Sequence, residues 1–235
     1  MIRKDFIPGT EYAIYQDDEK FSFGIDAILL SDFARLRKDS SLIDLCTGGG
    51  IVALRCHGIY GLSRVWGIEI QEDVAQLAQR SVRENGLEEI ITLLHGDLRE
   101  KWDLPQVDSI TVNPPYFERG RGIINSTEND RISRYEVEME LEDIFLFARR
   151  HLRERGKLFI VHRPGRLPDL VAFGRQYGLE PKRMRFVESK ENTQPILLLL
   201  ECVRAGGKNF IVEPALTIYR DGKYTREIEE IYYGK

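Results

Sequence analysis

Apolar and polar residues alternate with two different periods along most of this 235-residue chain. Short apolar runs, typical of buried strands, are followed by longer segments in which apolar residues recur every three or four positions, as on one face of a helix. These strand–helix units repeat from residue 41 to residue 187, which predicts an α/β fold: a mostly parallel sheet with helices on both faces. Strands are expected at 41–45, 64–70, 90–94, 107–112, 157–161, 182–187 and 196–203, and helices at 50–56, 72–85, 141–155 and 167–177.

The ends of two predicted helices carry termination signals. Gly86 follows the helix at 72–85, and Gly156 follows the helix at 141–155, whose last turns carry arginines. Both signals are typical of helix C-termini. No helical pattern separates the last two predicted strands, so we expect an antiparallel hairpin at that C-terminal edge of the sheet. The chain shows no repeat, low-complexity tract or linker, which predicts one domain over residues 1–235.

The composition is that of a soluble protein, with 42% hydrophobic and 31% charged residues. The N-terminus lacks the apolar core of a secretory signal, and the apolar run at 195–200 is too short to span a bilayer. We therefore expect a cytoplasmic protein without a membrane partner. Its three cysteines show neither metal-ligand nor redox spacing, so no metal is expected.

The charge of the chain is unevenly distributed. The formal net charge is −4, but residues 139–235 hold 18 Lys and Arg against 14 Asp and Glu, or +4. The first 138 residues hold the remaining 16 cations against 24 acidic residues, or −8. This asymmetry permits a basic face on an acidic protein, although scattered surface charges would give the same counts.

A cluster of glycines follows the first predicted strand and opens the first predicted helix. Gly48, Gly49 and Gly50 would let the backbone pass close beneath a ligand. Dinucleotide-binding enzymes share such a turn, but their glycine spacing differs, and no Lys-Ser or Lys-Thr pair marks a phosphate loop here. Asp44 precedes the glycines and would repel a pyrophosphate. An acidic residue at this place suits a cofactor with a cationic sulfonium and an ammonium group, namely S-adenosylmethionine.

Acidic residues also end the next two predicted strands. Glu69 could accept hydrogen bonds from both ribose hydroxyls of an adenosine. Asp97 could accept one from the adenine amino group, although an aspartate that caps a turn or helix would give the same pattern. We count its neighbour Leu98 with the cofactor-binding residues. Because open α/β sheets bind ligands at the carboxyl ends of their strands, these residues are expected in one site.

The strand at 107–112 ends in Asn113-Pro114-Pro115-Tyr116. Two prolines cannot continue a ladder, so the chain must leave the sheet there in a stiff bend. The amide oxygen of Asn113 and the carbonyl of Pro114 could accept the two N–H bonds of a planar amino group, on which the ring of Tyr116 could stack. A plain strand-ending turn uses the same residue types. Next to a methyl donor, the motif indicates methylation of an amino nitrogen.

Together, residues 44–50, Glu69, Asp97 and the Asn-Pro-Pro-Tyr turn resemble class I S-adenosylmethionine-dependent methyltransferases that modify exocyclic or amide nitrogens. Gly48 and Gly50 match the glycine pattern of that superfamily, whereas Cys46 stands where its first glycine is usual. Segments at 21–30, 133–136, 161–164 and 224–234 extend the resemblance to bacterial tRNA (adenine-N6)-methyltransferases that act beside the anticodon of a valine tRNA. Tyr135 stands where that family more often has histidine.

The resemblance implies a class I (Rossmann-like) methyltransferase sheet and transfer of a methyl group from S-adenosylmethionine to N6 of an adenine in tRNA. It also implies that residues 1–40 form an extension over the cofactor site, in which the segment 21–30 covers the methionine end. The helical spacing of that segment would equally suit a core helix. The implied catalytic residues are Asn113, Pro114 and Tyr116, and the implied cofactor-binding residues are Asp26, Asp44, Gly48, Gly50, Glu69, Asp97 and Leu98.

The resemblance makes tRNA the expected partner and leaves the oligomeric state open, and arginines near the Asn-Pro-Pro-Tyr turn would bind RNA phosphates. These are Arg119, Arg121, Arg134 and Arg163, with further cations at 149–153 and 182–185 that solvated surface positions would explain equally well. Similar turns also bind glutamine side chains and the amino group of guanine. N5-glutamine methylation of a release factor and guanine-N2 methylation of RNA are therefore the alternatives. The first is disfavoured because such enzymes usually carry an additional N-terminal helical domain.

Overall fold

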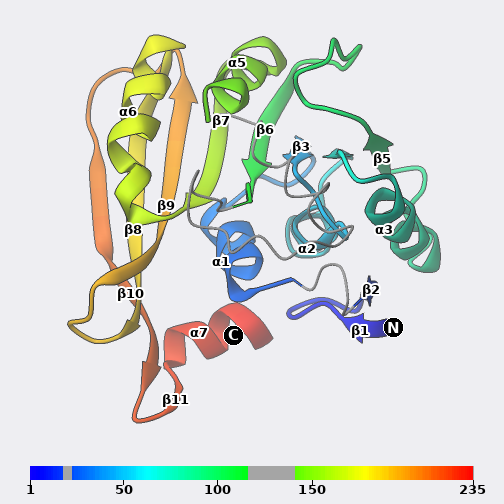
Figure 1. Ribbon diagram of the computed structural model, residues 1–235, viewed down its shortest axis with the longest axis horizontal. Helices are drawn as coiled ribbons and strands as arrows, with labels where there is room; N and C mark the ends of the chain where they lie inside the picture. Colours follow the sequence, from blue (N-terminus) through cyan, green and yellow to red (C-terminus); the bar gives the residue numbers. More distant parts are fainter. Residues whose placement is uncertain (18–22, 116–140, 235) are drawn as a thin grey trace, which may run out of the picture.

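A computed structural model describes residues 1–17, 23–115 and 141–234, and a nine-stranded sheet runs through the centre of these residues (Figure 1). Its strands are β3 (Ser41–Leu45), β4 (Arg64–Glu69), β5 (Ile91–His95), β6 (Val107–Val112), β7 (Leu152–His162), β8 (Leu179–Lys190), β9 (Pro195–Arg204), β10 (Ile211–Arg220) and β11 (Lys223–Tyr224). The helices are α1 (Ile25–Phe33), α2 (Ile51–Tyr60), α3 (Glu72–Glu84), α5 (Leu141–His151), α6 (Leu167–Gln176) and α7 (Arg226–Tyr233), with a 3-10 turn at Pro164–Arg166. A separate hairpin pairs β1 (Ile2–Phe6) with β2 (Ala13–Asp17).

The order across the sheet is β11-β10-β8-β9-β7-β6-β3-β4-β5. Strand β3 lies between β4 and β6 and is parallel to both, so the chain reverses its direction of winding there. Open α/β sheets bind ligands at such a switch point, outside the carboxyl ends of the strands. Strand β9 is antiparallel to its two neighbours, β7 and β8. The predicted mostly parallel sheet with antiparallel C-terminal strands is therefore confirmed.

Helices cover both faces of the sheet, as predicted. Alternate residues of a strand point to opposite faces, and β7 shows the consequence. Phe159 and Val161 are buried in one apolar core with residues of α1, α2 and α7. Leu158 and Ile160 are buried in a second core with residues of α5 and α6. Figure 1 shows α5 and α6 together alongside strands β7 to β9, apart from α1.

Several predicted boundaries are wrong. The helix expected at 50–56 continues to Tyr60, and the strand expected at 182–187 spans Leu179–Lys190. The helix expected at 141–155 ends at His151, and β7 begins with the next residue. Leu152 is fully buried and pairs with Val107 of β6, so burial of this leucine in the sheet outweighs the helical propensity of the arginines that follow. The backbone then bends at Arg155, whose φ is +65°, before regular pairing resumes.

Several elements were not expected from the sequence pattern, namely the β1–β2 hairpin, β10, β11 and α7. Strand β10 pairs in parallel with β8, and β11 closes an antiparallel edge on β10. Helix α7 then packs against α1.

The side chain of Arg55 in α2 joins these outlying parts. It is only 1% exposed and donates hydrogen bonds to the carbonyl of Pro8 (3.0 Å), to Oγ of Ser31 in α1 (2.7 Å) and to the carbonyl of Ile231 in α7. A buried guanidinium is stable only when its donors are satisfied, so Arg55 fixes the positions of three segments relative to α2.

None of the helices in the described part of the chain has the length and apolar character that crossing a membrane would require.

Candidate functional site

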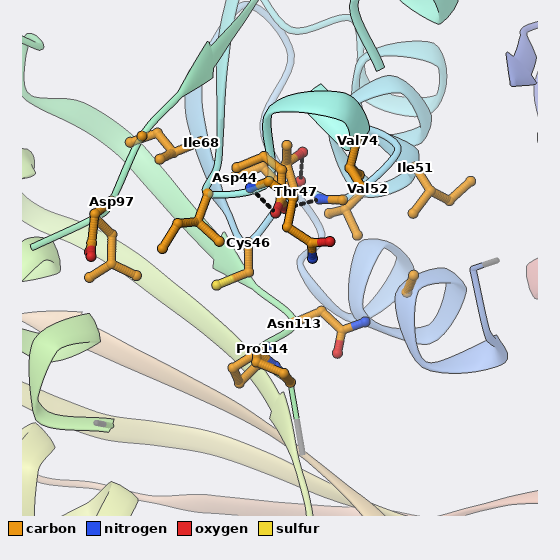
Figure 2. A pocket seen from close by; sticks show the side chains of 18 of the residues that line it. Asp44, Cys46, Thr47, Ile51, Val52, Ile68, Val74, Asp97, Asn113 and Pro114 are labelled. Atoms are coloured by element: carbon orange, nitrogen blue, oxygen red, sulfur yellow. Dashed lines mark hydrogen bonds between the residues drawn. The ribbon is translucent and has the colours of Figure 1, made fainter. Parts of the chain in front are cut away.

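A cavity of about 340 Å³ lies at the carboxyl ends of β3, β4, β5 and β6 (Figure 2). The position is the one that the switch point at β3 predicts. Eight of the residues expected in the site line this cavity: Asp26, Asp44, Gly48, Glu69, Asp97, Leu98, Asn113 and Pro114. Among the described residues, Gly50 and Arg163 are the two expected site residues that lie outside the lining. Tyr116, Arg119, Arg121, Arg134 and Tyr135 lie outside the described residues.

The glycine cluster forms the turn between β3 and α2, and the turn requires left-handed backbone at three positions. The φ angles are +53° at Cys46, +54° at Gly48 and +85° at Gly50, which precedes the first residue of α2. Glycine adopts such angles without steric cost. Cys46, the departure from the family pattern, adopts the same conformation with a side chain, and a non-glycine residue there is strained.

A fourth glycine, Gly67 in β4, gives the turn its space. A Cβ on Gly67 would lie 3.0 Å from both Cγ2 and Oγ1 of Thr47, which sits in the middle of the turn. The backbone N–H of Thr47 also donates to the carbonyl of Ile68 in β4 (3.0 Å). The turn is therefore pressed directly against the neighbouring strand.

Asp44 is almost fully buried at the end of β3, with 1% of its surface exposed. Its carboxylate accepts hydrogen bonds from the hydroxyls of Thr47 (2.5 Å) and Thr111 (2.7 Å). Burial disfavours the charged form more strongly than these bonds favour it, and raises the pKa of Asp44 to about 7. A nearby cation would stabilise the ionised form.

Glu69 ends β4 and is also buried, which raises the pKa of its carboxyl group. One carboxylate oxygen accepts the backbone N–H of Gly48 (2.9 Å), and the other accepts that of Gln71 (3.0 Å). A carboxylate oxygen has two lone pairs, so each can accept a second donor. Glu69 thus braces the glycine turn while it lines the cavity.

Asp97 follows β5 and is paired with Arg99. The Arg99 guanidinium donates to both carboxylate oxygens, with the shortest contact at 2.6 Å from Nη2 to Oδ2, and the Arg99 backbone N–H donates as well (2.8 Å). These hydrogen bonds lower the pKa of Asp97. Arg99 lines the cavity too. An adenine amino group would have to share the Asp97 carboxylate with this guanidinium, which the sequence pattern alone did not suggest.

Asn113 directly follows β6 and lies at the opposite side of the cavity from Thr47 and Val74 (Figure 2). Its amide nitrogen donates to Oδ2 of Asp26, in the first turn of α1, at 3.1 Å. Pro114 follows and is buried, and Pro115 also lines the cavity. The structure therefore brings Asp26 and Asn113, 87 positions apart in the sequence, into direct contact in the cavity lining.

The basic residues of the C-terminal part lie in different places. Arg163 is exposed at the end of β7, the strand next to β6, and so near the cavity end of the sheet. Arg153 instead pairs with Asp108 at the start of β6 (2.9 Å), which is the opposite end of the sheet. Arg183 in β8 pairs with Glu201 in β9 (2.8 Å), on strands that do not line the cavity. Of the wider cationic set, these last two stabilise the fold rather than face the cavity.

Sequence reasoning missed three polar residues of the site: Thr47, Thr111 and Arg99. A hydroxyl three residues beyond a buried aspartate could have indicated Thr47. Thr111 contacts Asp44 only because β6 pairs with β3, with Asp44 opposite Thr111 in the register.

Comparison with characterised sequence families supports the resemblance drawn from the sequence, because several relatives carry the name of the same methyltransferase. The tRNA1(Val) (adenine(37)-N6)-methyltransferase of Tolumonas auensis is 27% identical over 191 residues, covering 81% of this chain and 79% of the relative. The protein of the same name from Porphyromonas gingivalis strain W83 is 26% identical over 246 residues, covering 97% and 95%. The recognition of this family is thereby confirmed.

A solved structure shows the same fold. A protein from Agrobacterium tumefaciens, described as a predicted O-methyltransferase, superimposes with a TM-score of 0.69 over 88% of this chain and 95% of its own, at 16% sequence identity. The family model called methyltransferase small domain matches residues 20–168, which is more than half of the chain and contains the whole cavity lining. This chain belongs to the methyltransferase small domain family.

Proposed function

We propose that this protein transfers a methyl group from S-adenosylmethionine to the exocyclic N6 of an adenine in tRNA, beside the anticodon of a valine tRNA. The observation that carries the proposal is the hydrogen-bonded Asn113 at the rim of an acidic cavity. Relatives that align with nearly the whole chain carry the name of that reaction. The motif geometry and these names support the same substrate group.

The cavity fits the proposed cofactor in size and chemistry. Its volume of about 340 Å³ lies in the range of small-molecule sites. Its apolar walls include Ile51, Val52 and Val74, which suit an adenosine, and its carboxylates suit a cationic ligand. Asp44 would hold the cationic part, and Glu69 the ribose. Asp97 and Leu98 would hold the adenine.

When bound, the cofactor supplies an electrophilic methyl group, and the chain supplies orientation. An aromatic amine is a weak nucleophile because its lone pair is delocalised into the ring. Hydrogen bonds accepted by the amide oxygen of Asn113 and the carbonyl of Pro114 would hold both N–H bonds and direct the lone pair toward the methyl donor. No general base is required, because the amine becomes acidic once it is alkylated. Tyr116 would stack on the flipped base.

Two further parts of the proposal concern the surroundings of the site. Residues 1–40 form the cover of the cofactor site within a single domain; in support, Gly24, Asp26 and Ala27 line the cavity. Arg163, together with Arg119, Arg121 and Arg134, binds phosphates of the tRNA.

The test is incubation with labelled S-adenosylmethionine and total tRNA, followed by nucleoside analysis. Labelled N6-methyladenosine is expected. Labelled N2-methylguanosine would move the reaction to guanine, and label in protein would favour the glutamine substrate.

Asn113→Ala provides the matching residue test. Removal of one oriented polar group should lower the turnover number by ~10²-fold while cofactor binding persists. Gln194→Ala, which removes an exposed amide side chain outside the cavity lining, is the control and should keep wild-type turnover. Wild-type turnover by Asn113→Ala would contradict the proposed role.

A further inference from the structure

The contact between α1 and the end of β6 has a defined polarity. Nδ2 of Asn113 donates to Oδ2 of Asp26 at 3.1 Å, and Oδ1 of Asp26 accepts the backbone N–H of Ala27 at 2.9 Å. In Figure 2 the Asn113 side chain extends from the end of β6 toward the helix that carries Asp26. We propose that Asp26 is a positioning residue that fixes the orientation of the Asn113 amide, and so presents its oxygen to the substrate amine. This inference rests on the proposed function.

The chemistry of an amide makes such a device necessary. The two ends of an asparagine side chain have nearly the same shape, but only the oxygen can accept a hydrogen bond from a substrate N–H. If the amide were turned over, its own N–H bonds would meet those of the amine and repel them. A carboxylate accepts hydrogen bonds and donates none, so it favours the amide nitrogen on its side and disfavours the oxygen. Asp26 therefore selects one of the two orientations.

A neighbouring glycine gives independent support for a built arrangement. A Cβ on Gly24 would lie 2.6 Å from Oδ1 of Asp26, well inside van der Waals contact. The φ angle of Gly24 is −97°, which any residue adopts, so its backbone conformation does not call for glycine. Glycine at position 24 is therefore explained by the Asp26 carboxylate, which occupies the space that a larger side chain would need.

The helix that carries Asp26 is also held rigidly. Ala27, Ile28 and Leu29 are almost completely buried in the apolar core. The Arg55 guanidinium contacts the same helix through the hydroxyl of Ser31 at 2.7 Å. A carboxylate on such a support can hold its partner within the narrow range of geometry that transfer requires.

The kinetic test compares Asp26→Ala with Asp169→Ala, the same substitution at an exposed aspartate of α6 outside the cavity lining. With saturating cofactor, Asp26→Ala should lower the turnover number roughly 10-fold, because the charge-assisted bond that selects the orientation is lost. Its dissociation constant for S-adenosylmethionine should stay within about 2-fold of wild type. Gly24→Ala, which keeps the carboxylate but displaces it, should lower turnover in the same direction. Asp169→Ala should keep the wild-type turnover number.

If Asp26 were instead a direct ligand of the cofactor, the effects on turnover and on cofactor affinity would be exchanged. Asp26→Ala would then weaken cofactor binding, and turnover at saturation would be retained. That result would overturn the positioning role.

A second measurement does not depend on the substrate. The side-chain NH2 signals of Asn113, assigned by their absence in Asn113→Asp, report its hydrogen bond in ¹⁵N-labelled protein without tRNA. Hydrogen exchange of this group should be roughly 10-fold faster in Asp26→Ala than in wild type, and unchanged in Asp169→Ala. Equal exchange in wild type and Asp26→Ala would overturn the inference. A wild-type protein that methylates no tRNA would instead refute the proposed function, and the exchange measurement would still decide the role of Asp26.

Discussion

Asp44 should make cofactor binding depend on pH near neutrality. Burial raises the pKa of its carboxyl group to about 7, although hydrogen bonds from Thr47 and Thr111 act in the other direction. At neutral pH the cofactor-free protein is therefore a mixture of protonated and ionised forms. A cation bound beside Asp44 favours the ionised form, so binding should release the proton.

The size of the effect follows from that pKa. With a value of about 7, roughly one tenth of the protein has an ionised Asp44 at pH 6, and roughly nine tenths at pH 8. Affinity for S-adenosylmethionine should therefore rise about 10-fold between these values, or about 1.4 kcal/mol. Near pH 7, about half a proton should be released for each cofactor bound.

The stability of the cofactor-free protein should show the opposite trend. The pKa of Asp44 is higher in the folded protein than its ordinary value of 3.8, so the folded state binds this proton more tightly. The resulting stabilisation is complete below pH 3.8 and is lost as the pH rises through about 7. At pH 8, Asp44→Asn should have a higher melting temperature than wild type. Its free energy of unfolding should be larger by at most about 4 kcal/mol.

Titration calorimetry at pH 6, 7 and 8, in two buffers of different ionisation enthalpy, measures both the affinity and the proton release. Thr111→Val removes a hydrogen bond that lowers the pKa, so its midpoint should lie at higher pH than that of wild type. Asp169→Asn, at an exposed aspartate, is the control for a lost surface charge. The reasoning is refuted if the pH dependence is the same in wild type and Thr111→Val, and Asp44→Asn melts no higher at pH 8.

Four further outcomes can be checked by binding or unfolding measurements. Gly67→Ala should weaken S-adenosylmethionine binding about 10-fold, because its Cβ would press on Thr47 at 3.0 Å; unchanged affinity would contradict this. Cys46→Gly should unfold at a higher temperature than Cys46→Ala, because both lose the thiol but only glycine removes left-handed strain of about 1 kcal/mol at φ +53°; a lower melting temperature than Cys46→Ala would speak against stored strain. Arg55→Met should cost about 3–5 kcal/mol in urea unfolding, since several buried acceptors lose their donor; a loss under about 1 kcal/mol would speak against its linking role. Affinity for tRNA should fall steeply as salt is raised, and salt-independent affinity would exclude the arginine contacts.

The parts of the fold that the sequence predicted are those with local signals. The strand–helix units from β3 to α6 follow from hydrophobic period, and the glycine turn and the Asn-Pro-Pro motif have distinctive residues at their own positions. Asp44, Glu69 and Asn113 could be assigned to one site because parallel strands end at a common edge.

The remaining features depend on contacts between distant segments. Strand β10 carries exposed Ile211 and Val212 and no strict alternation, so its place beside β8 is set by pairing rather than by pattern. Helix α5 ends early because the sheet buries Leu152. The bond between Asp26 and Asn113 joins two motifs that the sequence had marked separately, and only the folded chain shows that they act on each other.

Arg55 links helix α7 to α1. The Arg55 guanidinium donates to the carbonyl of Ile231 in α7 and to the hydroxyl of Ser31 in α1, whose first turn carries Asp26. A protein truncated before Arg226 would lack the Ile231 carbonyl, so the Arg55 guanidinium would lose one of its acceptors. Helix α1 would then be held less firmly, and with it the Asp26 carboxylate that orients the Asn113 amide. We expect this truncated protein to bind S-adenosylmethionine with an affinity close to that of the full chain, but to have a lower turnover number.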